Sequence, residues 1–182
     1  MRSRRRIRWR SDLEVRRTVR RLLRELDVQP PFDVQDFCVR LGNKRGRPIR
    51  LLPHSLPVPG PCGLWLATTN FDLVMYQAEA TTGHQEHIIL HELGHIISDH
   101  PGDESDDDFL EYLLPALPSA AVRRALRRTG YDADHEREAE LVATVIKEWA
   151  TLLAHLEPHI DRSGTSTSRR LRSALDDRQG WL

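Results

Sequence analysis

The chain has 182 residues, a length typical of one domain with a single buried core. Hydrophobic residues make up 39% of the chain and charged residues 30%. No apolar run approaches the roughly 20 residues that a membrane-spanning helix needs, so we expect a soluble protein without a membrane span. The two cysteines exclude a disulfide-rich scaffold and favour a cytoplasmic location.

Charge is distributed unevenly along the chain, although the formal net charge is zero. Residues 1–50 carry 16 Lys and Arg against 6 Asp and Glu, whereas residues 51–120 carry 11 acidic residues and no Lys or Arg. An acidic middle segment disfavours nucleic-acid binding over the whole surface, and it suits a cation site. We therefore expect a function that does not depend on direct binding to nucleic acid.

The composition divides the chain into one domain and two tails. Residues 1–12 form a basic tail without apolar periodicity, and residues 161–182 form a polar tail. The domain is expected over residues 13–160. Its fold class is expected to be α+β: mostly helical, with a small sheet of about three short strands before the helix that carries the main motif.

Two helices are predicted before the sheet. The first begins after Ser11, because Ser11 and Glu14 have the spacing of a capping box. Its apolar residues recur with helical spacing as far as Leu26, opposite a face rich in arginine. The second helix begins after Asp33, whose side chain can cap a helix, and it is expected to stop at Gly42.

Three short apolar runs are predicted to be strands, at 49–52, 64–67 and 73–76. The residues between the last two runs are expected to form a hairpin turn. The Pro- and Gly-rich segment between the first two is expected to be a loop.

The rest of the domain is predicted to be helical apart from one acidic loop. A helix is expected over 82–98, followed by the acidic loop over 99–108. Two short helices are expected over 109–114 and 120–128, and a long helix over 134–156.

The strongest motif is HELGH at residues 91–95, an HExxH pattern on a predicted helix. His91 and His95 are one helical turn apart, so both imidazoles can reach one Zn²⁺ ion. Glu92 lies beside that face, where it can take a proton from an attacking water. The sequence therefore predicts a metal site with two histidine ligands and Glu92 as the catalytic base.

Such a site needs a third protein ligand, and the long helix offers several candidates. Glu138 extends the apolar stripe of this helix, where a carboxylate is costly unless it is paired or bound to a metal. We therefore predict Glu138 as the third ligand, and Asp134, His135 and Glu136 remain possible in its place. Glu136 and Glu140 are expected to lie on an exposed, charged face.

Other polar side chains near the motif receive minor roles. His84 is expected at the surface, His87 exposed or hydrogen-bonded near the start of the motif helix, and His100 beside the acidic loop. Tyr131 could donate a hydrogen bond to an oxyanion in a closed site.

Together these motifs resemble those of the ImmA/IrrE family of bacterial metallopeptidases. The HELGH motif is followed by a later helix that contains EREAELVA at 136–143, and both are similar to motifs of that family. The resemblance covers roughly residues 28–150. It implies a zincin-like fold, Zn²⁺ as the cofactor, and completion of the metal site by the Glu that precedes Ala, which is Glu138 here.

The resemblance also implies a function. Members are similar to zinc-dependent endopeptidases, and several cleave a helix-turn-helix repressor. Here Val142 stands where the family has an aromatic residue before Ala143. The alternative is therefore a catalytically weak zinc-fold protein that binds such a regulator as a regulatory or toxin–antitoxin-type partner. Mn²⁺ or another divalent ion could take the place of zinc.

Overall fold

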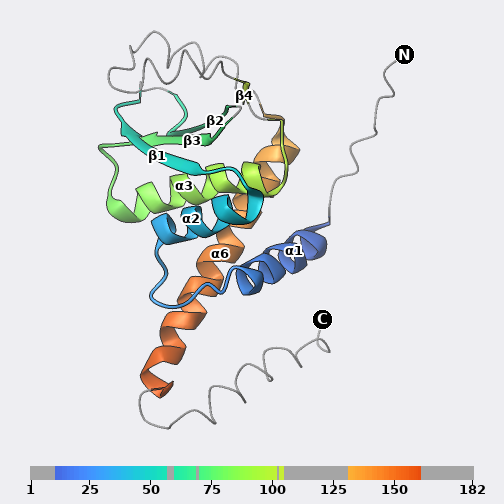
Figure 1. The fold of residues 1–182 in the computed structure, drawn as a ribbon, viewed down its shortest axis with the longest axis vertical. Helices are drawn as coiled ribbons and strands as arrows, with labels where there is room; N and C mark the ends of the chain where they lie inside the picture. The colour runs from blue at the N-terminus through green and yellow to red at the C-terminus, as the bar shows by residue number, and fades with distance from the viewer. Residues whose placement is uncertain (1–10, 57–59, 69, 102, 105–130, 161–182) are drawn as a thin grey trace.

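The fold is α+β and mostly helical, as predicted, with a small mixed sheet (Figure 1). The predicted helices at 109–114 and 120–128, together with residues 1–10 and 161–182 of the tails, lie outside the described residues. The computed structural model describes residues 11–56, 60–68, 70–101, 103–104 and 131–160.

Helix α1 (Asp12–Glu25) begins as the sequence predicts. The Ser11 hydroxyl accepts a hydrogen bond from the Glu14 backbone N–H, and the Glu14 carboxylate accepts one from the Ser11 backbone N–H. This complete capping box satisfies amide groups that have no partner inside the helix. The predicted apolar stripe is buried along α1 through Val15, Val19 and Leu23.

Helix α2 (Val34–Arg45) is capped by Asp33, as predicted, but its predicted end is wrong. The helix continues past Gly42 and ends at Gly46, whose φ of 67° is the left-handed conformation that favours glycine. Gly42 is buried instead, and a Cβ there would lie 3.1 Å from the backbone of Arg47. Close packing therefore explains this glycine, which the sequence pattern presented as a stop signal.

The sheet has the strand order β1-β3-β2-β4. Strands β2 (Gly63–Ala67) and β3 (Asp72–Gln77) form the predicted antiparallel hairpin, and β1 (Ile49–His54) lies parallel to β3. The short strand β4 (Asp103–Glu104) pairs with the end of β2, within a segment expected to be a loop. Two acidic residues show no apolar alternation, so the pattern could not indicate this pairing.

Two long helices complete the fold. Helix α3 (Thr82–Ile97) lies along one face of the sheet, and α6 (Ala133–Ile160) crosses α3 and packs against α1 (Figure 1). A Cβ on Gly94 would lie 2.5 Å from the carbonyl oxygen of Ala139, so the two helices approach closely at this point. Across the described segments, no helix is both long and apolar enough to pass through a membrane.

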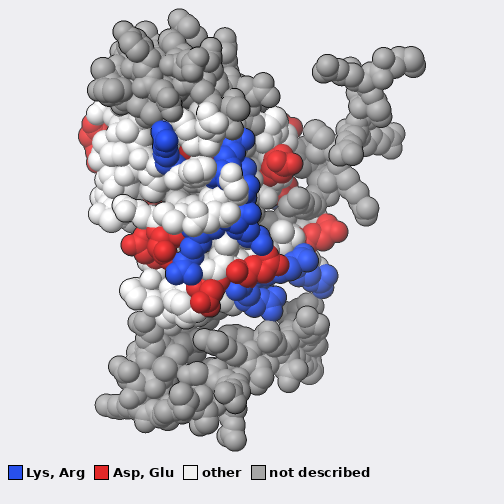
Figure 2. Space-filling view, in the orientation of Figure 1, with Lys and Arg blue, Asp and Glu red and all other residues white. Residues whose placement is uncertain are grey.

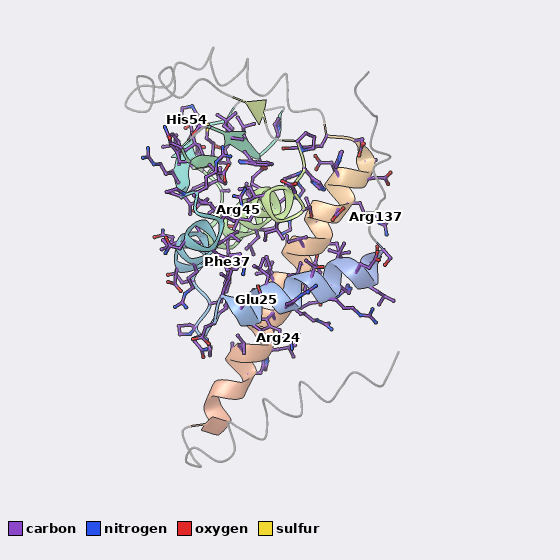
Figure 3. All side chains as sticks on the ribbon, turned by 45° about the vertical axis from the view of Figure 1, so that its right-hand side comes forward. Arg24, Glu25, Phe37, Arg45, His54 and Arg137 are labelled. Carbon is purple, nitrogen blue, oxygen red and sulfur yellow. The ribbon has the colours of Figure 1, made fainter. Side chains whose placement is uncertain are left out.

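Both faces of β2 and β3 are buried. Trp65 and Val74 point toward the helices and join a large core with Phe37 of α2, which is labelled in Figure 3. Leu64 and Leu73, which alternate with them along the strands, belong to a second cluster on the opposite face. This arrangement explains why the strands are nearly continuous apolar runs in the sequence.

A buried carboxylate connects the sheet to the turn after α2. Asp72 is fully buried, and its oxygens lie 2.5 Å from Arg45 Nη1 and 3.4 Å from Arg47 Nε. The indole N–H of Trp65 donates to the same carboxylate at 3.0 Å. These partners compensate the loss of hydration that a buried charge suffers.

The arginine-rich face predicted for α1 is exposed. Figure 2 shows Lys and Arg side chains gathered over the region of α1 and α2, with some acidic side chains among them. Arg17, Arg20 and Arg21 are exposed, whereas Arg16 is half-buried and pairs with Glu148 of α6 at 3.0 Å. The outer side of α1 is therefore a cationic surface.

Candidate metal centre

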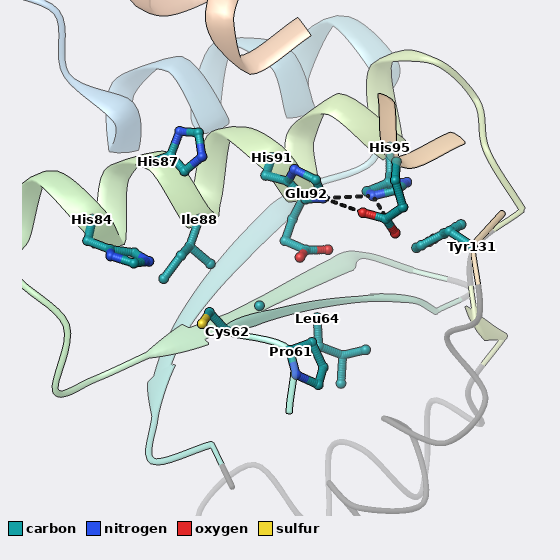
Figure 4. Close-up of a pocket in the computed structure, with 12 residues that line it drawn as sticks. Pro61, Cys62, Leu64, His84, His87, Ile88, His91, Glu92, His95 and Tyr131 are labelled. Atoms are coloured by element: carbon teal, nitrogen blue, oxygen red, sulfur yellow. Dashed lines mark hydrogen bonds and ion pairs between the residues drawn. The ribbon is translucent and has the colours of Figure 1, made fainter. Parts of the chain in front are cut away.

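A pocket of about 300 Å³ opens between α3 and the residues that lead into β2. Figure 4 shows His84, His87, His91 and His95 in a row along α3, with Pro61–Leu64 opposite them. The row follows from helical spacing, because residues three and four positions apart share one face. The pocket is thus lined on one side by imidazoles.

Three side chains in this pocket bring ligand atoms together. His91 Nε2 and His95 Nε2 lie 3.2 Å apart. One Glu136 oxygen lies 3.1 Å from His91 Nε2, and the other lies 3.9 Å from His95 Nε2. These atoms lie within 4.8 Å of one another and could hold a metal ion.

The donor set is one that could hold a divalent metal ion. Two nitrogens that each lie about 2.0–2.1 Å from a tetrahedral zinc are about 3.3–3.4 Å apart, slightly more than the 3.2 Å between the two Nε2 atoms here. Two histidines and one glutamate are a typical ligand set of catalytic zinc, with a fourth position left for water. The same atoms could also accept other divalent ions.

The third member of the cluster is Glu136, rather than Glu138, which the sequence favoured. Glu138 lies on the buried side of α6, as expected, with its side chain 11% exposed, but its carboxylate lies 3.7 Å from His100 Nε2. Glu136, 48% exposed, lies on the outer side of α6. The histidine face of α3 meets this side of α6 rather than the apolar stripe, so the structure brings Glu136, one of the alternatives to Glu138, close to the two histidines.

Asp134 and His135, which the sequence also offered as third ligands, do not join the cluster. Asp134 is exposed at the start of α6. His135 is buried, with Nδ1 3.0 Å from the Asp132 carboxylate. Asp132 also accepts hydrogen bonds from the backbone N–H groups of both residues, so it caps the helix.

Glu92 lies in the pocket wall with only 6% of its surface exposed. Burial and the neighbouring Glu136 charge raise the pKa of its carboxyl to about 8, although the Trp65 backbone N–H stabilises the charged form. A Cβ on Gly63 would lie 2.5 Å from Glu92 Oε1. The glycine at the start of β2 therefore leaves room for the carboxylate.

His95 is the most buried of the three clustered side chains, with 1% exposed. Burial lowers its pKa to about 3, and the neighbouring His91 and His100 contribute to this shift. The imidazole is therefore neutral at pH 7, which is the form that binds a metal.

Several neighbours were missed or given minor roles by the sequence. Glu140, expected to be only a surface charge, has an oxygen 3.3 Å from His91 Nδ1 and 3.4 Å from His87 Nε2. Tyr131 lines the pocket and stacks on His95 with 3.8 Å between ring centroids. His100, which received a minor role, is buried against His95.

Comparison of the chain with models of protein families, with curated proteins and with solved structures found no match. The resemblance to the ImmA/IrrE family therefore rests on the motifs at 91–95 and 136–143. The chemistry of the pocket is the basis on which a function can be inferred.

Proposed function

We propose that this protein is a zinc-dependent endopeptidase. The observation that carries the proposal is the convergence of His91, His95 and Glu136 beside the buried carboxylate of Glu92 in one pocket. A metal site with an adjacent acid–base group is the arrangement that metal-assisted hydrolysis requires. The HExxH spacing on α3 gives the same assignment for three of these four side chains.

In the proposed reaction, His91, His95 and Glu136 hold the ion, which supplies a Lewis acid for the scissile carbonyl and lowers the pKa of water. The Glu92 carboxylate takes a proton from the attacking water and later delivers it to the leaving amine. A dication beside Glu92 favours its ionised form, which the metal-free pocket disfavours.

The proposed substrate is a protein, and the family resemblance favours a helix-turn-helix transcriptional repressor. We propose a cytoplasmic location, in keeping with the two free cysteines at Cys38 and Cys62.

The first experiment measures bound metal by mass spectrometry after the purified protein is loaded with zinc and freed of excess. We expect about one zinc per chain in the wild type. His95→Ala and Glu136→Gln should lose it, because each removes a ligand atom of the cluster. Glu138→Gln, two residues away on the same helix, should retain the stoichiometry.

If Glu138→Gln lost zinc and Glu136→Gln kept it, Glu138 would be the third metal ligand, as the sequence predicted. A wild type that takes up no zinc or other divalent ion would overturn the proposed activity.

A second candidate function is favoured by the cationic surface on α1. In this case the zinc fold binds a regulator without cleaving it, and Arg17, Arg20 and Arg21 contact an acidic patch on the partner.

Mixing the protein with a purified helix-turn-helix repressor distinguishes the two candidates. Cleavage predicts new fragments that disappear in Glu92→Gln. Binding alone predicts an intact complex that Glu92→Gln does not change. Replacing the three arginines with glutamate should then weaken the complex, with a loss that becomes smaller at high salt.

A further inference from the structure

A second buried histidine, His100, contacts the imidazole of His95. Helix α3 ends at Ile97 and is capped by Ser98, and the next residue, Asp99, has a φ of 57°, which reverses the direction of the chain. The His100 backbone N–H then donates to the His95 carbonyl at 3.0 Å, and the Asp99 N–H donates to the Ile96 carbonyl at 3.3 Å. These two bonds form a Schellman motif, and the motif places His100 next to His95.

The side chains repeat this contact. His95 Nδ1 and His100 Nδ1 lie 2.9 Å apart, in a part of the structure where both rings are buried. On its far side, His100 Nε2 lies 3.7 Å from the Glu138 carboxylate. The side chains of His95, His100 and Glu138 therefore form a chain of successive contacts, and this chain leads away from the metal cluster.

The ring nitrogens of His95 and His100 can be assigned as hydrogen-bond donors or acceptors. A neutral imidazole has one N–H and one acceptor nitrogen, and the nitrogen that binds a metal must be the acceptor. His95 turns Nε2 toward His91 and Glu136, so its proton belongs on Nδ1. That Nδ1–H can donate to His100 Nδ1, which leaves the His100 proton on Nε2, facing the Glu138 carboxylate.

We propose that His100, backed by Glu138, is a positioning residue that fixes the orientation and tautomer of His95 for metal binding. The inference rests on the proposed zinc site and adds residues that the HExxH motif does not contain. It also gives Glu138 a role: its carboxylate lies on the buried side of α6, 3.7 Å from His100 Nε2, where its charge favours a proton on that nitrogen. Outer residues of this kind typically contribute about 10- to 100-fold in metal affinity.

The test has two readouts on the full-length protein. The first is the affinity for zinc, measured by competition with a chelating indicator. His100→Leu, which removes the acceptor, should weaken zinc binding by about 10- to 100-fold. His100→Gln, which keeps a neutral acceptor, should recover part of that loss, and Glu138→Gln should lose less than His100→Leu. His155→Gln is the control and should leave zinc affinity unchanged, because His155 is exposed on α6 and is not among the residues that line the pocket.

The second readout is the tautomer of His95 in the zinc-free wild type, observed by ¹H–¹⁵N NMR of the imidazole rings. We expect the proton on Nδ1, and we expect His100→Leu to change the population of this tautomer. This measurement needs neither catalysis nor bound zinc, so it tests the inference even if the proposed peptidase activity fails.

Two results would overturn the inference. One is a folded His100→Leu protein whose zinc affinity equals that of the wild type while His95→Ala loses zinc. In that case the metal centre stands and the positioning role falls. The other is a zinc-free wild type with the His95 proton on Nε2.

Discussion

Glu92→Gln is expected to abolish peptide cleavage and, at the same time, to stabilise the metal-free protein. Removing the general base should lower the cleavage rate by about 10²–10⁴-fold, while zinc binding through the three neighbouring ligands continues. Burial and the Glu136 charge raise the Glu92 pKa to about 8, so an ionised carboxylate at pH 7 is unfavourable in the folded state. A neutral amide of the same shape removes this cost.

The stability gain has a defined pH dependence. Because the folded pKa is raised, the folded protein binds one more proton than the unfolded chain between about pH 4.5 and pH 8. The contribution of Glu92 to stability is therefore full below pH 4.5 and decreases as the pH rises toward 8. Glu92→Gln should match the wild type near pH 4.5 and exceed it by about 1–3 kcal/mol at pH 7.

Urea unfolding of the zinc-free protein at several pH values measures this difference. Glu86→Gln, on the same helix but only half-buried, is the control and should follow the wild type at every pH. A Glu92→Gln protein that is less stable than the wild type at pH 7 would show that the carboxylate is stabilised where it lies. Undiminished cleavage by this variant would remove Glu92 from the reaction.

Much of the fold could be predicted because local signals agreed with the tertiary structure. The capping box at Ser11 and the Asp33 cap gave the starts of α1 and α2, and the apolar runs gave β2 and β3. Gly42 misled because glycine serves two purposes, helix termination and close packing, which the sequence alone does not distinguish.

The site was predictable where it depends on one helix and not where it depends on two. Spacing within α3 places His91 and His95 on one face, and the structure agrees. The choice between Glu136 and Glu138 depends on which side of α6 packs against the histidines of α3. The periodicity of apolar residues within α6 does not give this information. Burial predicted the side of Glu138 correctly, but the carboxylate is matched there to His100 and not to the metal cluster.

His100 shows the same limit in another form. Its contact with His95 depends on the left-handed turn at Asp99, a conformation that non-glycine residues adopt only in a few per cent of cases. A histidine five residues after the motif carries no periodic signal. An Asp at the expected end of the helix was the single local clue to a chain reversal.

The close crossing of α3 and α6 leads to the second large expected effect. Gly94→Ala should destabilise the protein by about 1–3 kcal/mol, although alanine is the better helix former by about 1 kcal/mol. The new Cβ would lie 2.5 Å from the Ala139 carbonyl oxygen and 2.8 Å from its Cα, and backbone atoms cannot turn aside as a flexible side chain can. The helices must therefore move apart.

That separation should also reach the metal centre. Gly94 immediately precedes His95, and Ala139 follows Glu136 by less than one turn of α6, so a shift between the helices moves the carboxylate away from the imidazoles. We expect zinc affinity to fall at least about tenfold together with stability.

Gly83→Ala is the matched control, because nothing lies within 4 Å of a Cβ at that position on the same helix. It should change stability by less than about 1 kcal/mol, on the favourable side, and leave zinc affinity unchanged. If Gly94→Ala instead raised the urea midpoint as Gly83→Ala does, the two helices would have to lie farther apart than the glycine contact requires, and the placement of Glu136 beside the histidines would fall with it.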